Sequence, residues 1–482
     1  MDIDSPAPNP PKTHAVPKDA TRELTITGSY LRLPIKNAAP VWKLTLTADG
    51  KEEPPIAIGL ASGKPDWWGW KDVRSLMGKT VTLKLMGASQ GAADLVAITQ
   101  ADSIETPSDL YHEALRPQFH FSSRRGWLND PNGLSFYKGE YHLFYQHNPY
   151  GVPWGNMHWG HAVSRDLVHW HELSDALYPD EMGQMWSGSA VVDGRNTSGL
   201  GQKGQAPLVL IYTADKTWGI CLASTLDGRR ITKYADNPVI KQITKENRDP
   251  KVMWYEPEKK WVMVLFVPYP VEGLDAKEKS AKKNTIVFLS SPNLKDWTVM
   301  SQVPFSKECP DFFELPVDGD KAHQKWVLTS ANGDYKVGGF DGTAFTPETP
   351  MLPGPSGGKS YAAQTFGNMP QGDHRRIHIG WLQVPSPGMP FSQEMSVPIE
   401  LKLIATPEGP RLTWTPVEEL KALRGEGHHI KSLTLKPGDT NPLANVHGNL
   451  LEIRARFKPN EAGEMSLNVR GASVNYNAAT QE

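Results

Sequence analysis

Five polar phrases recur at nearly equal intervals in this 482-residue chain, and this repeat constrains the fold more than any other feature of the sequence. With Asp130, Ser187, Asp249, Glu308 and Tyr361 as markers, the intervals are 57, 62, 59 and 53 residues. Each unit has room for about four short strands and contains no sustained helical pattern. Repeated units of this kind are typical of propellers. The spacing therefore predicts an all-β chain with a five-bladed β-propeller over residues 111–420.

The five units also resemble one another in how they begin and end. Three of them close on related phrases, which are SRDLVHW, STLDGRRITKY and SSPNLKDW. The opening phrases are NDPNG, WSGS, RDP, ECPDFFE and YAAQTF. We expect each opening phrase on the innermost strand of its blade, where side chains from separate blades converge at the axis. This arrangement would bring residues about 60 positions apart into a single pocket.

The segments on either side of the repeat have different patterns. Residues 21–110 contain alternating strands such as VWKLTLTADG and GKTVTLKLMG, which predict a small β-sandwich-like domain. There, DWWGWKDV places two Trp side chains on one face of a strand, as a sugar platform or as a core or interdomain contact. Residues 421–482 contain two strand-like runs, GNLLEIRARFK and GEMSLNVRG, which predict the start of an apparently incomplete C-terminal β-sandwich. The Pro-rich residues 1–20 are expected to form a disordered leader.

Charge and composition narrow the possible partners. The formal net charge is −2 and no long block of like charge occurs, which argues against a nucleic-acid or anionic membrane partner. No apolar run reaches transmembrane length. The chain starts without an apolar signal region, so we expect a secreted or periplasmic mature form or, alternatively, a cytoplasmic protein. The two cysteines are not expected to pair, because a chain of this size needs no disulfide. Sixteen Trp residues fit a neutral, ring-shaped ligand such as a sugar.

Three of the opening phrases supply carboxylates, and their surroundings suggest different roles. Cleavage of a glycosidic bond requires one carboxylate at the anomeric carbon and one protonated carboxyl group that donates to the leaving oxygen. Asp130 lies in the rigid turn-forming run WLNDPNG and suits the nucleophile. Glu308 precedes Pro310 and two phenylalanines, a setting that favours the protonated form needed by an acid. Asp249 beside Arg248 is expected to stay ionised and to accept hydrogen bonds from sugar hydroxyl groups.

Several motifs together resemble those of glycoside hydrolase family 32. They are WLNDPNG (127–133), FYQHNP (144–149), HWGHAVSRDLVHW (158–170), WSGSAV (186–191), RDP (248–250) and ECPDFFEL (308–315). The resemblance covers about residues 116–425 and implies a five-bladed propeller followed by a β-sandwich, retention of configuration and no cofactor. It also implies that Asp130 is the nucleophile, Asp249 the transition-state stabiliser and Glu308 the acid/base. The sugar contacts that the resemblance suggests are Asn129, Asn132, Gln146, Trp154, Trp186, Ser187, Arg248 and Trp381.

This sequence departs from the family pattern in two respects. Trp186 stands before Ser-Gly-Ser where the family usually has Phe, and we expect it to narrow the rim of the pocket. The segment after residue 425 is much shorter than the family's C-terminal sandwich. Many members of the family also lack an N-terminal β-domain, and the resemblance does not explain the one predicted here.

Three functions remain open at this stage. The first is a hydrolase that releases terminal β-D-fructofuranosyl units from sucrose, levan or inulin. The second is a fructosyltransferase that uses the same carboxylates, and the third is a non-catalytic fructan-binding module. Eight histidines between residues 112 and 171 raise the question of a metal, but their spacing fits no ligand set and no catalytic metal is expected. The sequence does not determine the oligomeric state.

Overall fold

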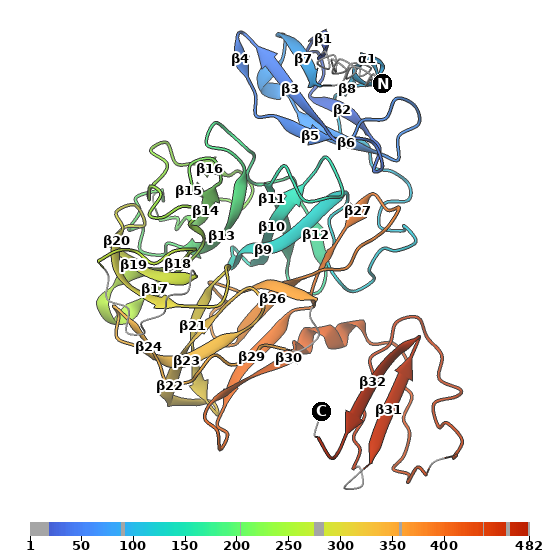
Figure 1. Cartoon of the computed structure of the whole chain (residues 1–482), viewed down its shortest axis with the longest axis vertical. Coiled ribbons are helices and arrows are strands. Elements are labelled where there is room, and N and C mark those ends of the chain that lie inside the picture. Colours follow the sequence, from blue (N-terminus) through green and yellow to red (C-terminus); the bar gives the residue numbers. More distant parts are fainter. Residues whose placement is uncertain are drawn as a thin grey trace, which may run out of the picture. The chain divides into compact units, whose positions relative to one another are not determined.

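A computed structural model of the chain describes residues 19–87, 92–202, 204–273, 284–355, 359–436, 438–458 and 463–480 (Figure 1). It is almost entirely composed of strands and divides into two compact units, Met1–Glu419 and Leu420–Glu482. Most of the leader predicted at residues 1–20 lies outside the described residues. No helix in the described part of the chain is long and apolar enough to cross a membrane.

The first unit contains a five-bladed β-propeller, as the repeat predicted. The first three blades are antiparallel four-stranded sheets in which the strands follow one another in chain order. Their innermost strands are β9 (Gly126–Tyr137), β13 (Met185–Val192) and β17 (Arg248–Tyr255). The outer strands are β10 (Glu140–Asn148), β11 (His158–Ser164), β12 (Trp170–Glu172), β14 (Leu208–Ala214), β15 (Gly219–Thr225), β16 (Thr232–Lys233), β18 (Lys260–Val267), β19 (Thr285–Ser291) and β20 (Thr298–Pro304).

The last two blades belong to one nine-stranded sheet, because β21 and β29 meet at the single pair Val317 and Leu403. Blade four has the order β21-β22-β23-β24, and blade five has the order β25-β26-β29-β30, with β28 added beside β26. Their bounds are β21 (Asp311–Val317), β22 (Asp320–Thr329), β23 (Tyr335–Phe340), β24 (Phe345–Pro347), β25 (Ser360–Thr365), β26 (Arg376–Leu382), β28 (Glu394–Met395), β29 (Ile399–Ile404) and β30 (Arg411–Pro416).

Packing between blades explains why the middle strands read as continuous apolar runs. In β14, LVLIYTA, every residue is buried, and in β18, KWVMVLFV, all but the first are. Both faces of these strands are covered, so the alternation of a half-exposed strand is lost. The ring is closed by β27 (Phe391–Ser392), which lies between β26 and β28 of blade five in the chain and pairs in parallel with β9 of blade one. This contact joins the last blade to the first.

The N-terminal part of the first unit is a small β-domain formed by two sheets (Figure 1). Its apolar core includes Leu31, Leu33, Leu44, Leu46 and Leu83, all fully buried. One sheet has the order β1-β7-β3-β4 with β5 beside β3, and the other has the order β6-β2-β8. The bounds are β1 (Ala20–Thr25), β2 (Tyr30–Ile35), β3 (Trp42–Ala48), β4 (Lys51–Glu52), β5 (Ile56–Ile58), β6 (Trp67–Asp72), β7 (Thr80–Met86), β8 (Thr99–Ala101) and the short helix α1 (Ala92–Val96).

The Trp pair that the sequence singled out lies on β6. Trp68 is stacked by the guanidinium of Arg32, 3.8 Å from the ring centroid, and Trp70 meets Tyr30 edge-on. The face of Trp68 is therefore already occupied by a side chain of its own domain.

Within its described residues, the second unit contains one two-stranded sheet, β31 (Glu464–Val469) and β32 (Ala472–Asn477). The strand predicted at GNLLEIRARFK is absent, because residues 448–458 have no regular structure. That prediction was wrong: the run contacts β32 through Phe457 and Tyr476, but its backbone pairs with neither β31 nor β32. Its apolar side chains stay exposed instead: Leu450, Leu451, Ile453 and Phe457.

Candidate active site

Four of the five innermost strands are interrupted by a bulge at a candidate residue, whereas Glu308 lies just before the innermost strand β21. In β9 the two residues Asn129 and Asp130 lie opposite Gln146 alone, because the paired residues step from Leu128–His147 to Pro131–Tyr145. The same one-residue insertion occurs in β13 at Ser187, in β17 at Asp249 and in β25 after Tyr361. A bulge redirects a side chain and leaves backbone groups unpaired, which strands next to active sites commonly exploit. The repeat thus places four re-aimed residues around one axis.

Unusual backbone geometry accompanies these bulges. Asp249 has φ of 60°, Cys309 has φ of 49° and Ala362 has φ of 51°. All three lie in the left-handed region, which is energetically unfavourable for residues other than glycine. Gly188 shows the closeness of approach, because a Cβ there would lie 2.0 Å from the carbonyl oxygen of Ile211. The sheets hold Gly188, Asp249 and Ala362 in place, because residues on both sides of each are paired in register.

Asp130 is oriented through both of its carboxylate oxygens. The hydroxyl of Ser187 donates to Oδ2 at 2.7 Å, and Nδ2 of Asn129 donates to Oδ1 at 3.1 Å. Asn129 is itself fixed by Trp127, whose Nε1 donates to its Oδ1 at 2.9 Å. Burial raises the pKa of Asp130 and the charge of Glu308 adds to this, while the hydrogen bonds from Ser187 and Asn129 oppose it.

Asp249 lies beside Asp130 and shares a neighbour with it. The backbone N–H of Cys309 donates to Oδ2 of Asp249 at 3.1 Å, and the Cys309 thiol lies 3.4 Å from this oxygen and 3.6 Å from Oδ2 of Asp130. Burial raises the pKa of Asp249 to about 7; Arg248 opposes this shift, and the charges of Glu308 and Asp130 add to it. Burial and the same carboxylates raise the pKa of Cys309, so its thiol is a neutral donor between two carboxyl groups.

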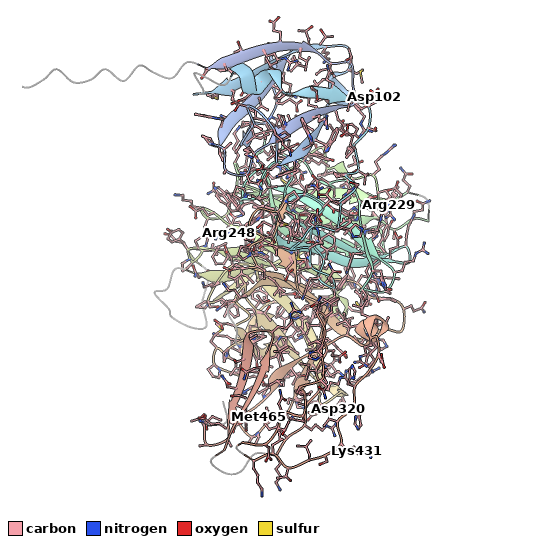
Figure 2. The ribbon with its side chains drawn as sticks, turned by 90° about the vertical axis from the view of Figure 1, so that its right-hand side faces the viewer. Asp102, Arg229, Arg248, Asp320, Lys431 and Met465 are labelled. Carbon is pink, nitrogen blue, oxygen red and sulfur yellow. The ribbon has the colours of Figure 1, made fainter. Side chains whose placement is uncertain are left out.

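Glu308 is held by an arginine and a tyrosine. Arg248, labelled in Figure 2, donates to Oε2 of Glu308 through Nε at 2.9 Å and Nη2 at 2.7 Å. Tyr361 donates its hydroxyl to Oε1 at 2.9 Å. Blades three, four and five therefore meet at this one carboxyl group, which is partly exposed, with 30% of the side chain accessible.

The geometry corrects one expectation about Arg248. Its principal partner is Glu308, and its Nε lies 3.8 Å from Asp249, beyond hydrogen-bond distance. Burial of the Asp249 carboxyl group raises its pKa, and the charge of Arg248 offsets this shift only in part. Adjacent positions in the sequence do not settle which carboxylate a long side chain reaches.

A pocket at the axis is lined by two of the three carboxyl groups and by residues of all five blades. Its lining residues are Asp130, Pro131, Asn132, Ser187, Gly188, Asp249, Cys309, Pro310, Ala362, Ala363 and Gln364. Asn132 and Ser187 are thus brought to the pocket together with the carboxylates. No group of three or more His, Cys, Asp or Glu in the described chain has the arrangement of a metal site.

The other predicted sugar contacts surround the pocket without lining it. Gln146 is buried and donates from Nε2 to the carbonyl of Met185 at 2.9 Å. Trp186 contacts Trp154 edge-on, with ring centroids 5.9 Å apart. Trp381 meets Tyr361 edge-on at 6.0 Å and so borders the Glu308 side of the site.

Three residues that the list of predicted contacts omitted belong to the site: Cys309, Tyr361 and Gln364. Gln364 lines the pocket and donates from Nε2 to the carbonyl of Gly188 at 3.1 Å. Its Oε1 is buried and has no hydrogen-bond partner among the described residues, and the same is true of Nδ2 of Asn132. Buried polar atoms without partners are costly unless a ligand satisfies them. The signal for all three was their place in the opening phrases ECPDFFE and YAAQTF.

The fold and the site together define the class of protein. An all-β propeller in which carboxyl groups from three blades converge near the axis has the paired carboxyl groups that a glycoside hydrolase requires. Residues 120–416 match the family described as Glycosyl hydrolases family 32 N-terminal domain. The chain belongs to this family, as its motifs suggested.

Individual relatives agree with this assignment. The chain is 45% identical over 394 residues to a protein named levanase from Bacillus subtilis, covering 75% of this chain and 56% of that protein. It is 34% identical over 434 residues to the extracellular exo-inulinase inuE of Aspergillus niger, covering 77% of each. The crystal structure of an exo-inulinase from Aspergillus awamori matches with a TM-score of 0.56 at 32% identity, covering 65% of this chain and 69% of that one. The chain thus spans little more than half the length of the levanase.

Proposed function

We propose that the chain is a retaining β-fructosidase that hydrolyses terminal β-D-fructofuranosyl units of sucrose or fructans. The observation that carries this proposal is the meeting of Asp130, Asp249 and Glu308 around Cys309 and Arg248, in a member of family 32. The names of the relatives, levanase and exo-inulinase, support a fructan substrate.

Asp130 acts as the nucleophile in this proposal. Its carboxylate attacks the anomeric carbon, the bond to the leaving oxygen breaks, and a fructosyl ester forms on Asp130. Ser187 and Asn129 hold the two oxygens in one orientation before the substrate arrives, which removes an orientational cost from the reaction. These two hydrogen bonds also favour the ionised form that attack requires.

Glu308 acts as the acid and then as the base. Its proton goes to the leaving oxygen in the first step, and in the second step it accepts a proton from the water that attacks the ester. Arg248 and Tyr361 position the carboxyl group through separate oxygens. Asp249 accepts hydrogen bonds from ring hydroxyl groups, and its interaction strengthens as positive charge develops on the sugar.

The division of roles between Asp130 and Glu308 is testable with azide. Asp130→Asn removes the nucleophile, so turnover of every fructoside should be lost. Glu308→Ala removes proton transfer, which is worth about 10²–10⁴ in rate, but leaves attack intact. With an activated fructoside, azide should restore turnover of Glu308→Ala and give a fructosyl azide of retained configuration.

The matched controls are Asp249→Asn, which should be inactive without azide rescue, and Asp296→Asn on an exposed turn, which should behave as the wild type. A fructosyl azide of inverted configuration would contradict the proposal. So would azide rescue of Asp130→Ala, since it would mean that the two roles are exchanged.

We further propose that the chain works outside the cytoplasm, in a secreted or periplasmic form. The support is that the related exo-inulinase of Aspergillus niger is named extracellular. Cell fractionation with an activity assay tests this, and activity confined to the cytoplasm would contradict it.

A further inference from the structure

The loop between β10 and β11, residues 149–157, is shared between the propeller and the N-terminal β-domain. Tyr150 is only 3% exposed and belongs to the apolar core of the N-terminal domain, together with Leu33 and Trp67. Val152 packs against the same core. Two side chains of a propeller loop thus complete the core of the other domain.

Asn156 fastens the end of this loop to the edge strand β5. The backbone N–H of Ala57 donates to Oδ1 of Asn156 at 2.8 Å, and Nδ2 of Asn156 donates to the carbonyl of Ala57 at 2.7 Å. On its other edge, β5 pairs with β3, so that Asn156 and β3 lie on opposite edges of β5. The amide therefore pairs with the free edge as a neighbouring strand would. Asn156 has φ of 46°, a conformation that Asn and Gly adopt most readily.

Trp154 lies between these two attachments and extends away from them toward the site. Its side chain is 51% exposed, and its ring meets Trp186 edge-on. Trp186 directly precedes Ser187, which donates to Asp130. An exposed indole at this place offers an apolar face to a sugar ring.

We infer that the N-terminal β-domain is a positioning module for substrate binding, which acts by holding loop 149–157 so that Trp154 stands at the mouth of the pocket. This inference rests on the proposed function. None of the attaching groups touches a carboxylate of the site. Loosening the loop should therefore raise KM and leave kcat nearly unchanged.

Two variants loosen the loop from opposite sides. Asn156→Gly keeps the left-handed backbone accessible but removes the amide. That amide also donates to Oδ1 of Asn148 within the same region. Ala57→Pro therefore isolates the domain contact, because it removes one N–H from an edge strand where proline is tolerated. Asn196→Gly is the matched control, since Asn196 has φ of 50° and accepts from Gly201 in a turn of the propeller.

We expect Asn156→Gly and Ala57→Pro to raise KM for a fructose-containing trisaccharide about fivefold, with kcat within about twofold of wild type. Asn196→Gly should leave both unchanged. In a Trp154→Ala background, Asn156→Gly should have no further effect on KM, because the loop acts through Trp154. Independent, multiplying effects of the two substitutions would overturn the inference, and so would an unchanged KM in both loop variants.

Hydrogen exchange separates this inference from the proposed function. Exchange of residues 149–157 should accelerate in Ala57→Pro and not in Asn196→Gly. If the wild-type chain released no fructose from any fructoside, the proposed function would fail, and exchange would decide the positioning role by itself. Unchanged hydrogen exchange of residues 149–157 in Ala57→Pro would overturn the positioning role of the N-terminal β-domain.

Discussion

At the scale of single residues, the site is a set of carboxyl groups whose surroundings differ. Asp130 accepts two hydrogen bonds from side chains, Glu308 accepts from Arg248 and Tyr361, and Asp249 accepts from the backbone of Cys309. Two of them, Asp130 and Asp249, line one pocket, and burial raises the pKa of both. Bound substrate would replace water around all of them.

Gln364 provides a prediction at this scale, because its Oε1 lies buried at the pocket without a partner in the described chain. We expect Gln364→Leu to raise KM about tenfold by losing a hydrogen bond to a sugar hydroxyl, while kcat changes little. Steady-state kinetics on sucrose and on a fructan measure this. Gln324→Leu, at an exposed position of β22, is the control. An unchanged KM would show that Gln364 has only a structural role.

At the scale of elements, an innermost strand can have a bulge near its start and, just after the bulge, polar contacts that connect it to the neighbouring blades. Lys251 of β17 lies two residues after Asp249, and its Nζ is 3.2 Å from Oδ1 of Asp311 on β21 and 2.6 Å from the carbonyl of Thr365 on β25. Both charged side chains are at most 4% exposed. Three blades are therefore tied together directly beneath the bulges that carry the site.

This ion pair predicts an asymmetric effect of substitution. Lys251→Met leaves the buried Asp311 without its ionic partner, with only backbone N–H donors from Phe312 and Thr365, and should lower the free energy of unfolding by about 3–5 kcal/mol. The double variant Lys251→Met/Asp311→Leu should recover a large part of that loss, because no isolated charge remains. Denaturant unfolding of the wild type, both single variants and the double variant gives the coupling energy. Additive losses in the double variant would contradict this account.

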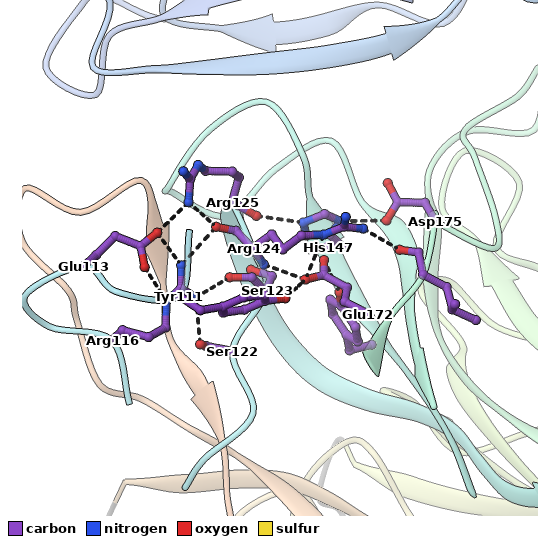
Figure 3. A network of polar contacts seen from close by, with 12 residues as sticks. Tyr111, Glu113, Arg116, Ser122, Ser123, Arg124, Arg125, His147, Glu172 and Asp175 are labelled. Carbon is purple, nitrogen blue, oxygen red and sulfur yellow. Dashed lines mark hydrogen bonds and ion pairs between the residues drawn. The ribbon is translucent and has the colours of Figure 1, made fainter. Parts of the chain in front are cut away.

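A second polar network fixes the segment before the first blade, as Figure 3 shows. Nδ1 of His147 lies 2.8 Å from Oδ1 of Asp175, and its Nε2 lies 3.0 Å from the carbonyl of Arg125. Burial of the imidazole disfavours its charge, but Asp175 outweighs this effect and raises the pKa of His147 to about 8. The protonated ring then donates from both nitrogens.

The raised pKa predicts a loss of stability in mild alkali. The group's contribution is fully present below pH 6.5, the ordinary pKa of histidine, and is lost as the pH rises through about 8. It amounts to about 2 kcal/mol. The difference in unfolding free energy between wild type and His147→Gln should therefore be largest below pH 6.5 and shrink above pH 8. His169→Gln, in an exposed His–Asp pair, is the control. A difference that stays constant from pH 6 to 9 would refute the linkage.

At the scale of the whole molecule, the two units differ in how well their apolar residues are covered. The first unit contains extensive buried cores in the N-terminal domain and between the blades. Among its described residues the second has a single hairpin, and four of its large apolar residues are 47–59% exposed: Leu433, Leu435, Leu450 and Phe457. Exposed apolar groups of this kind favour association.

This contrast predicts that residues 1–419 fold and turn over substrate without the second unit. Deletion of Leu420–Glu482 should leave kcat within about twofold, because no residue of the site lies there, and should reduce self-association. Light scattering at rising concentration and fructose release measure the two effects. Loss of soluble protein on deletion, or undiminished association, would contradict the prediction.

The sequence by itself determined the fold class, the family and the places in each blade where polar residues gather. It could do so because a repeat of about sixty residues and the phrases at its start are local patterns, readable without knowing what packs against them. The match to the family and the observed sheets confirmed the family assignment and the propeller. The functional roles of the three carboxyl groups remain predictions.

Only the tertiary structure decided how those residues are used. Arg248 pairs with Glu308, 60 residues away, and lies beyond hydrogen-bond distance of its neighbour Asp249. Gln364 lines the pocket, and the run GNLLEIRARFK forms no strand. Both outcomes depend on contacts with residues far away in the sequence. Loop 149–157 gains its anchor from Ala57, 99 residues away from Asn156. Contacts of that length form only when separate elements are packed, so no local pattern predicts them.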